Sequence, residues 1–102
     1  MTEHTQLFAD RAALAALCRR YHIRRLSLFG SVLKGTARPD SDVDLLVGFE
    51  PGHVPGMLTI AGIEEELSVQ LGGRQVDLRT AHDLSRHFRS EVVNTAEVQY
   101  VG

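Results

Sequence analysis

Hydrophobic and polar residues follow one another along the chain in patterns that alternate between helical and extended periods. The first pattern is helical, because Leu14, Leu17, Cys18 and Tyr21 recur at spacings of three, one and three. It predicts a helix from about Leu7 to Tyr21, with arginines toward the outside. Residues 1–6 are polar, and we expect them to be disordered.

Four extended segments follow this helix. Ile23–Phe29 has alternating apolar positions and predicts a strand, whereas Val43–Phe49 is almost continuously apolar. Such a continuous run is typical of a central strand that is covered on both faces. Gln75–Arg79 predicts a third strand, and the tail Glu97–Val101 predicts an edge strand.

A second helix is predicted from about Met57 to Leu71, because its apolar residues are spaced three or four apart and Gly72-Gly73 follows as a C-cap. A last helix is expected to begin at Asp83 or Ser85 and to end near Asn94. The connections are predicted as a helical turn, Ser31–Lys34, and two loops, Gly35–Ser41 and Glu50–Gly56.

This order of elements predicts an α/β (α+β) fold, in which helices pack on a small mixed β-sheet. The 102 residues are expected to form one domain spanning residues 1–102. No repeat or linker interrupts the chain.

Charge and cysteine content narrow the function classes. Thirteen Asp and Glu against eleven Lys and Arg give a net charge of −2, which argues against direct nucleic-acid binding by the domain. No stretch approaches the roughly 18 apolar residues that span a bilayer, so no membrane partner is expected. The single Cys18 cannot form an internal disulfide, which favours the reducing cytoplasm, and its place on the apolar helix stripe indicates a packed small hydrophobe.

Candidate chemistry begins in the second strand. Asp42 and Asp44 are two residues apart, so a strand would place both carboxylates on one face. Asp is a poor strand former, and two of them before an apolar strand require a reason. Asp77 lies in the third strand, and it would face the same patch if that strand neighbours the second. Three converging carboxylates need a cation, and an all-oxygen site favours Mg²⁺ or Mn²⁺ over zinc.

A purely structural role for these aspartates is the simplest alternative. In that case Asp40 and Asp42 are loop caps, and Asp44 and Asp77 are solvated edge positions. A calcium loop of the EF-hand type is excluded, because Leu45 occupies the position that requires Gly and Pro51 the position that requires Glu.

Gly30-Ser31 favours a binding site over a purely structural role. The pair follows the first strand and opens the predicted helical turn, where backbone N–H groups and the helix dipole attract anions. Gly30 permits close approach of the backbone to an anion, and Ser31 adds a hydroxyl donor.

Gly30-Ser31, ten intervening residues and Asp42-Val43-Asp44 form the pattern G-S-x10-D-x-D. This pattern resembles the nucleotidyltransferase superfamily with the polymerase-β-like core, and Asp77 falls where that superfamily has its third carboxylate. The segments LSLFGSVLKGTARPDSDVDLLVGFEPG and IEEELSVQLGGRQVDLRT are similar to the minimal branch, the MNT-type antitoxins of HEPN/MNT toxin–antitoxin pairs.

The resemblance implies a polymerase-β-like fold and a set of site residues. Asp42 and Asp44 would hold two Mg²⁺ ions, or Mn²⁺, on the triphosphate of ATP, and Asp77 would complete one metal site and help to deprotonate the acceptor hydroxyl. The nucleotide-binding residues would be Gly30 and Ser31 at the outer phosphates, with Lys34 and Arg38 neutralising phosphate charge or remaining solvated loop cations.

The resemblance also implies the activity, which is transfer of AMP from ATP to a hydroxyl, expected to be a Tyr, of a HEPN toxin. Two alternatives stay open: an antitoxin that only binds and masks the toxin, and a transferase for small molecules of the aminoglycoside type. Two local questions also stay open. Arg79 either contacts the nucleotide or pairs with Asp77, and the loop Glu50–Gly56 either covers the site or simply connects two elements.

Overall fold

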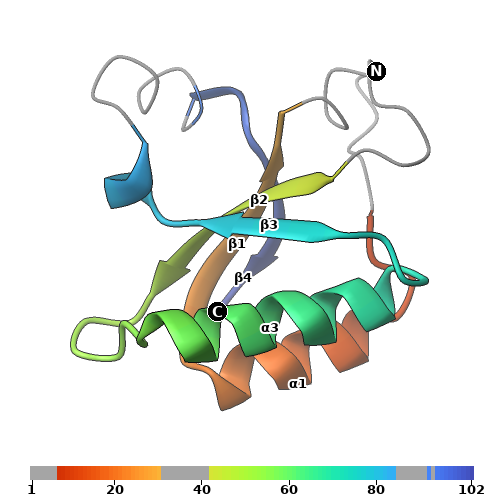
Figure 1. Ribbon diagram of the computed structural model, residues 1–102, viewed down its shortest axis with the longest axis horizontal. Helices are drawn as coiled ribbons and strands as arrows, with labels where there is room; N and C mark the ends of the chain where they lie inside the picture. Colours follow the sequence, from red (N-terminus) through yellow and green to blue (C-terminus); the bar gives the residue numbers. More distant parts are fainter. Residues whose placement is uncertain (1–6, 31–41, 85–91, 93) are drawn as a thin grey trace.

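The structure, a computed structural model, describes residues 7–30, 42–84, 92 and 94–102. Its centre is a four-stranded sheet in the order β3-β2-β1-β4 (Figure 1). The strands are β1 (Ile23–Phe29), β2 (Val43–Phe49), β3 (Val76–Arg79) and β4 (Glu97–Val101). β1 is antiparallel to both β2 and β4, while β2 and β3 are parallel. The mixed sheet and the edge position of the last strand are as predicted.

Two helices, α1 (Arg11–Arg20) and α3 (Met57–Gln70), lie side by side over one face of the sheet (Figure 1). Their buried residues form the main core with the residues of β2 that point toward them. Its members include Leu14, Leu17 and Cys18 of α1, Ile63 and Leu67 of α3, and Val43, Leu45 and Val47 of β2. Among the described residues, no helix has both the length and the apolar character needed to cross a membrane.

The opposite face of the sheet carries a second, smaller apolar cluster. It contains the buried residues Phe29, Leu84 and Val92, with Leu46 and Ala96 packed against them. Since side chains alternate along β2, its odd-numbered residues enter the main core and Leu46 enters the second cluster. β2 lies inside the sheet, as predicted, but its second face is covered only in part, because Leu46 is partly buried and Gly48 is exposed.

The first helix begins later than its apolar spacing predicted. The Asp10 side chain caps α1 by accepting a hydrogen bond from the Ala13 N–H at 2.9 Å. Leu7 instead donates its N–H to Oε1 of Gln99 in β4, and Phe8 is buried. Leu7 and Phe8 pack in the main core although they precede the helix. The predicted start of the helix at Leu7 is therefore wrong, because apolar character alone does not distinguish these residues from a helix face.

The predicted start of the last helix at Asp83 is wrong. Residues Ala81–Asp83 form a 3₁₀ turn, η1, in which the Asp83 carboxylate accepts the Thr80 N–H at 2.9 Å, and Leu84 is extended. Several predictions lie outside the described residues: the disorder of residues 1–6, the turn Ser31–Lys34, the loop Gly35–Ser41 and the alternative helix start at Ser85.

Glu64 of α3 binds a backbone N–H group of the edge strand β3. Its Oε2 accepts the Leu78 N–H at 2.7 Å in a partly buried position. Removing the acceptor would leave this N–H without its partner, so we expect Glu64→Ala to lower the free energy of unfolding by about 1–2 kcal/mol. Its neighbour Glu65 is exposed, and Glu65→Ala is the matched control with an expected change of about 0.5 kcal/mol or less. Urea unfolding of both variants measures the difference, and equal losses would contradict this role of Glu64.

Cys18 is fully buried in the main core. Burial raises the pKa of its thiol to about 12, so almost no thiolate exists at neutral pH. We expect Ellman's reagent to leave the native protein unmodified at pH 8 and to react with one thiol per chain after unfolding in urea. Rapid reaction of the native protein would contradict the packed position of Cys18, which agrees with the sequence prediction.

Candidate active site

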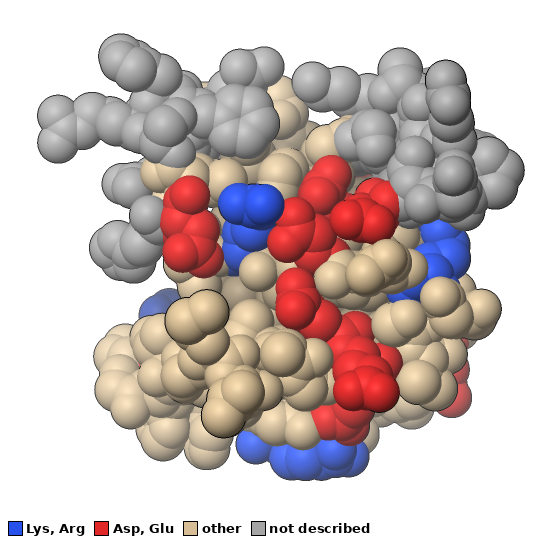
Figure 2. Space-filling model, viewed as in Figure 1, with Lys and Arg blue, Asp and Glu red and all other residues tan. Residues whose placement is uncertain are grey.

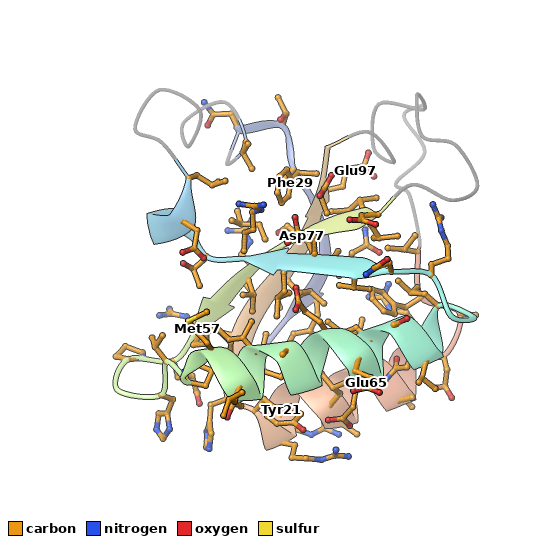
Figure 3. All side chains as sticks on the ribbon, in the orientation of Figure 1. Tyr21, Phe29, Met57, Glu65, Asp77 and Glu97 are labelled. Atoms are coloured by element: carbon orange, nitrogen blue, oxygen red, sulfur yellow. The ribbon has the colours of Figure 1, made fainter. Side chains whose placement is uncertain are left out.

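Asp44 and Asp77 lie side by side at one end of the sheet. Asp44 is the second residue of β2, Asp77 is the second residue of β3, and the two are paired in the parallel register. Val43, Leu45, Val76 and Leu78 point into the main core, so the two aspartates face the other way. In Figure 3, Asp77 lies on the side of β3 away from α3.

Asp42 directly precedes β2 and is exposed. Its charge acts on Asp44 together with that of Asp77, so the three carboxylates form one electrostatic cluster. The sequence analysis expected Asp77 to face the same patch if the third strand neighbours the second, and β3 does pair with β2. Figure 2 shows acidic side chains gathered on the exposed surface of this region, with basic side chains beside them.

The pKa of the Asp44 carboxyl is raised above its ordinary value. Burial is the largest cause, followed by the negative charges of Asp77 and Asp42, and the charge of Arg79 acts in the opposite direction. The ionised form of Asp44 is thus held where it is unfavourable without a neutralising partner. A cation or a proton at this position would relieve that cost.

Arg79 supplies part of the missing positive charge. Its Nε donates a hydrogen bond to Oδ2 of Asp77 at 3.1 Å, and both side chains are partly exposed. Arg79 is paired in register with Leu46, on the sheet face that also carries Asp44. Of the two possibilities left open by the sequence, the structure shows the pairing with Asp77.

Gly30 ends β1 directly against Asp44. Its φ of +80° belongs to the left-handed region that favours glycine. A Cβ at this position would lie 3.0 Å from Cγ and 3.1 Å from Cβ of Asp44, and closer still to Oδ2. The sequence indicated that Gly30 permits the approach of an anion, and the structure adds the approach of this carboxylate. Ser31, Lys34 and Arg38 lie outside the described residues.

The donor set fits a hard divalent cation, because it consists of carboxylate oxygens held beside one another. The side chains do not yet form a finished site. Among the described residues, no three His, Cys, Asp or Glu side chains are placed to hold one metal ion as they stand. Asp77 is turned toward Arg79, so the structure gathers the three predicted aspartates at one end of the sheet without assembling a three-ligand site.

The second apolar cluster adjoins this site, a position that the sequence analysis did not predict. Phe29 is buried and paired in register with Asp44, and Leu46 follows Asp44 by two residues on the same face of β2. The cluster therefore limits water at the inner side of the carboxylates. Leu46 could have indicated this position, because it is an apolar residue on the face of the strand that carries Asp44.

The loop Glu50–Gly56 does not cover the site. It leaves β2 after Phe49, whereas Asp42 and Asp44 lie at the beginning of that strand. Seven residues of strand separate the two ends by about 20 Å. The loop is a connector between β2 and α3, and the alternative of a cover is wrong.

Comparison with known proteins places this arrangement in a family. The model of the nucleotidyltransferase domain matches residues 11–98. The protein adenylyltransferase MntA of Thermococcus cleftensis is 40% identical over 82 residues, which cover 80% of this chain and 78% of MntA.

Solved structures agree with this assignment. A structure assigned to the minimal nucleotidyltransferases is 38% identical, has a TM-score of 0.70 and covers 93% of this chain and 97% of its own. A tri-AMPylated Shewanella oneidensis HEPN toxin in complex with an MNT antitoxin contains a chain with the same fold, at 18% identity and a TM-score of 0.62, covering 90% of this chain and 70% of that one. The chain therefore belongs to the nucleotidyltransferase domain family, among the minimal members related to MntA.

Proposed function

We propose that this protein is an antitoxin that transfers AMP from ATP to a hydroxyl, on a tyrosine, of a HEPN-type toxin. The observation that carries the proposal is the register pairing of Asp44 with Asp77 beside Gly30. It occurs in a chain that is 40% identical to a protein adenylyltransferase. We further propose that the protein acts in the reducing cytoplasm, which its single cysteine favours and where ATP is available as the donor.

Nucleotidyltransferases of this family use a divalent metal ion and a nucleoside triphosphate. In this chain Asp42, Asp44 and Asp77 would hold the metal, which we propose to be two Mg²⁺ ions. When bound, such a metal pair stabilises charge on the entering and leaving oxygens of an in-line displacement.

The chain's own residues orient the reactants. Gly30, without a side chain, leaves room for the Asp44 carboxylate against its backbone, and Ser31 would donate its hydroxyl to a phosphate oxygen. Lys34 and Arg38 would add positive charge to the same region. The buried Phe29 is paired in register with Asp44, and its low exposure to solvent strengthens electrostatic contacts at that carboxylate.

The reaction exchanges a phosphoanhydride bond of ATP for a phosphodiester bond to the acceptor. The acceptor oxygen forms a bond to the α-phosphorus of ATP, and the bond between that phosphorus and the bridging oxygen breaks as pyrophosphate leaves. The hydroxyl proton passes to an Asp77 carboxylate oxygen and from there to water. Asp77 is partly exposed, so this route to solvent is open.

Transfer of label from ATP tests the proposal. The protein is incubated with Mg²⁺, the purified toxin and ATP that carries the label either at the α- or at the γ-phosphate. We expect the toxin to be labelled by α-labelled ATP only. A free aminoglycoside, added as an alternative acceptor, is expected to stay unlabelled. Toxin labelled from the γ-phosphate, or not labelled at all, would contradict AMP transfer.

A rescue assay separates catalysis from masking. Cells producing the toxin are given either the wild-type chain or the double variant Asp42→Asn/Asp44→Asn. A catalytic antitoxin protects cells only with its carboxylates intact, whereas a masking protein protects equally well in both forms.

A further inference from the structure

Arg79 forms an ion pair with Asp77, the carboxylate that the proposed metal site needs as its third ligand. The Nε of Arg79 is 3.1 Å from Oδ2 of Asp77, and Asp77 is paired in register with Asp44. The guanidinium therefore neutralises a carboxylate that lies directly beside Asp44. No three-ligand metal group is assembled among the described residues in this arrangement.

The contact is built into the strand. Asp77 and Arg79 are two residues apart on β3, so both side chains lie on the same face of the sheet. Arg79 is about half exposed, so water can solvate its guanidinium when it leaves the carboxylate. Release of the pair is consequently inexpensive, since partly exposed ion pairs contribute little net free energy.

We propose that Arg79 is an internal counterion that holds Asp77 in the metal-free protein and releases it when the divalent cation binds. This inference rests on the proposed function, because it assumes that the aspartates bind a metal. Arg79 is thereby a positioning residue, which neutralises the cluster while it is empty and opposes premature metal binding.

The proposal predicts two effects of opposite sign in Arg79→Gln. Without metal, the variant loses the charge that offsets Asp77 and Asp44, and because the ion pair is partly exposed its unfolding temperature falls by a few degrees at most. When metal is added, the variant has no guanidinium that competes with the ion for Asp77. It also has no positive charge that repels the ion. A unit charge about 5 Å from a divalent ion changes its affinity by about tenfold at a solvent-exposed site. We therefore expect Arg79→Gln to bind Mn²⁺ about tenfold more tightly than the wild type.

Two variants serve as controls. Arg79→Lys keeps the positive charge at the site, and its Mn²⁺ affinity is expected to stay within about threefold of the wild type. Arg19→Gln removes an exposed positive charge from the last turn of α1, on the other side of the core. It is expected to leave the Mn²⁺ affinity unchanged, which shows that net charge alone does not explain the result.

Titration with Mn²⁺ alone, followed by electron paramagnetic resonance of the free ion, measures the affinities without nucleotide or toxin. Tighter binding by Arg79→Gln, together with a lower unfolding temperature in EDTA, supports the proposal. Equal or weaker binding by Arg79→Gln, with normal binding by the wild type, overturns the counterion role and leaves the proposed function intact. A wild-type protein that binds no Mn²⁺ removes the metal site itself, and both proposals fall.

Discussion

Asp44→Asn is expected to lower the rate of AMP transfer by about 10³-fold and, in the absence of metal, to raise the unfolding temperature. The loss of rate follows from the loss of a charged metal ligand. Metal ions contribute several kcal/mol to stabilising charge in a transition state, and each 1.36 kcal/mol corresponds to a factor of ten in rate. Asn keeps the size of the side chain, so the surrounding strands need not move.

The gain in stability follows from the raised pKa of Asp44. A carboxyl whose pKa is higher in the folded than in the unfolded protein is protonated more readily when folded, so stability falls as the pH rises through that range. At neutral pH the ionised Asp44 therefore costs free energy, and a neutral Asn does not. We therefore expect the metal-free Asp44→Asn variant to unfold at a higher temperature than the wild type at neutral pH.

Thermal unfolding in EDTA and the rate of label transfer from α-labelled ATP measure both effects on the same preparation. Glu65→Gln removes one exposed charge from α3 and serves as the control, with neither property expected to change. Mg²⁺ should raise the unfolding temperature of the wild type more than that of Asp44→Asn. Loss of both activity and metal-free stability in Asp44→Asn would instead indicate a structural role for the carboxylate.

Gly30→Ala is expected to damage both the fold and the reaction. The backbone at Gly30 has a φ of +80°, which costs a residue with a side chain about 1–2 kcal/mol. The new Cβ would also overlap the Asp44 carboxylate, and such overpacking costs about 1–3 kcal/mol more. The carboxylate must move to make room, and a displacement of about 1 Å lowers the reaction rate by roughly 10²-fold.

Gly52→Ala is the matched control for this variant. Gly52 has a φ of +81°, yet nothing lies within 4 Å of the position that its Cβ would occupy. It should therefore show the backbone cost alone, about 1–2 kcal/mol, with transfer activity unchanged. Urea unfolding and the label-transfer assay compare the two variants. Equal activity in both would mean that the contact of Gly30 with Asp44 is not needed for catalysis.

The central strands were predictable because short-range information determines them. The apolar runs in β1 and β2 are bounded by turn-forming residues, and the observed strands have the predicted bounds. The start of α1 was not predictable from spacing, since Leu7 and Phe8 are as apolar as a helix face. The Leu7 N–H instead donates a hydrogen bond to Gln99, a residue at the far end of the chain, and no local pattern contains that contact.

The candidate site was predictable only in part, for a similar reason. The sequence places Asp42 and Asp44 on one strand face, because their spacing requires only the alternation of a strand. The pairing of Asp77 with Asp44 depends on the strand order, which no local pattern contains. The ion pair between Arg79 and Asp77 could be named only as one possibility, since an exposed arginine on that face has several partners within reach.

The position of the loop Glu50–Gly56 shows the same limit. Its composition of glycine and proline correctly predicted a loop. Whether it covers the site depends on which end of β2 carries the aspartates, and they lie at the end away from this loop. The direction of the strand was already available from the sequence, so the alternative of a cover could have been excluded without the structure.

The mass of the toxin after co-production with this chain tests the central claim most directly. Toxin is purified from cells that produce it with the wild-type chain or with Asp42→Asn/Asp44→Asn, and its intact mass and modified residue are determined by mass spectrometry. We expect whole added AMP units on a tyrosine with the wild type and an unmodified toxin with the double variant. An unmodified toxin in cells that the wild-type chain protects, or equal modification by both forms, would contradict AMP transfer by this site.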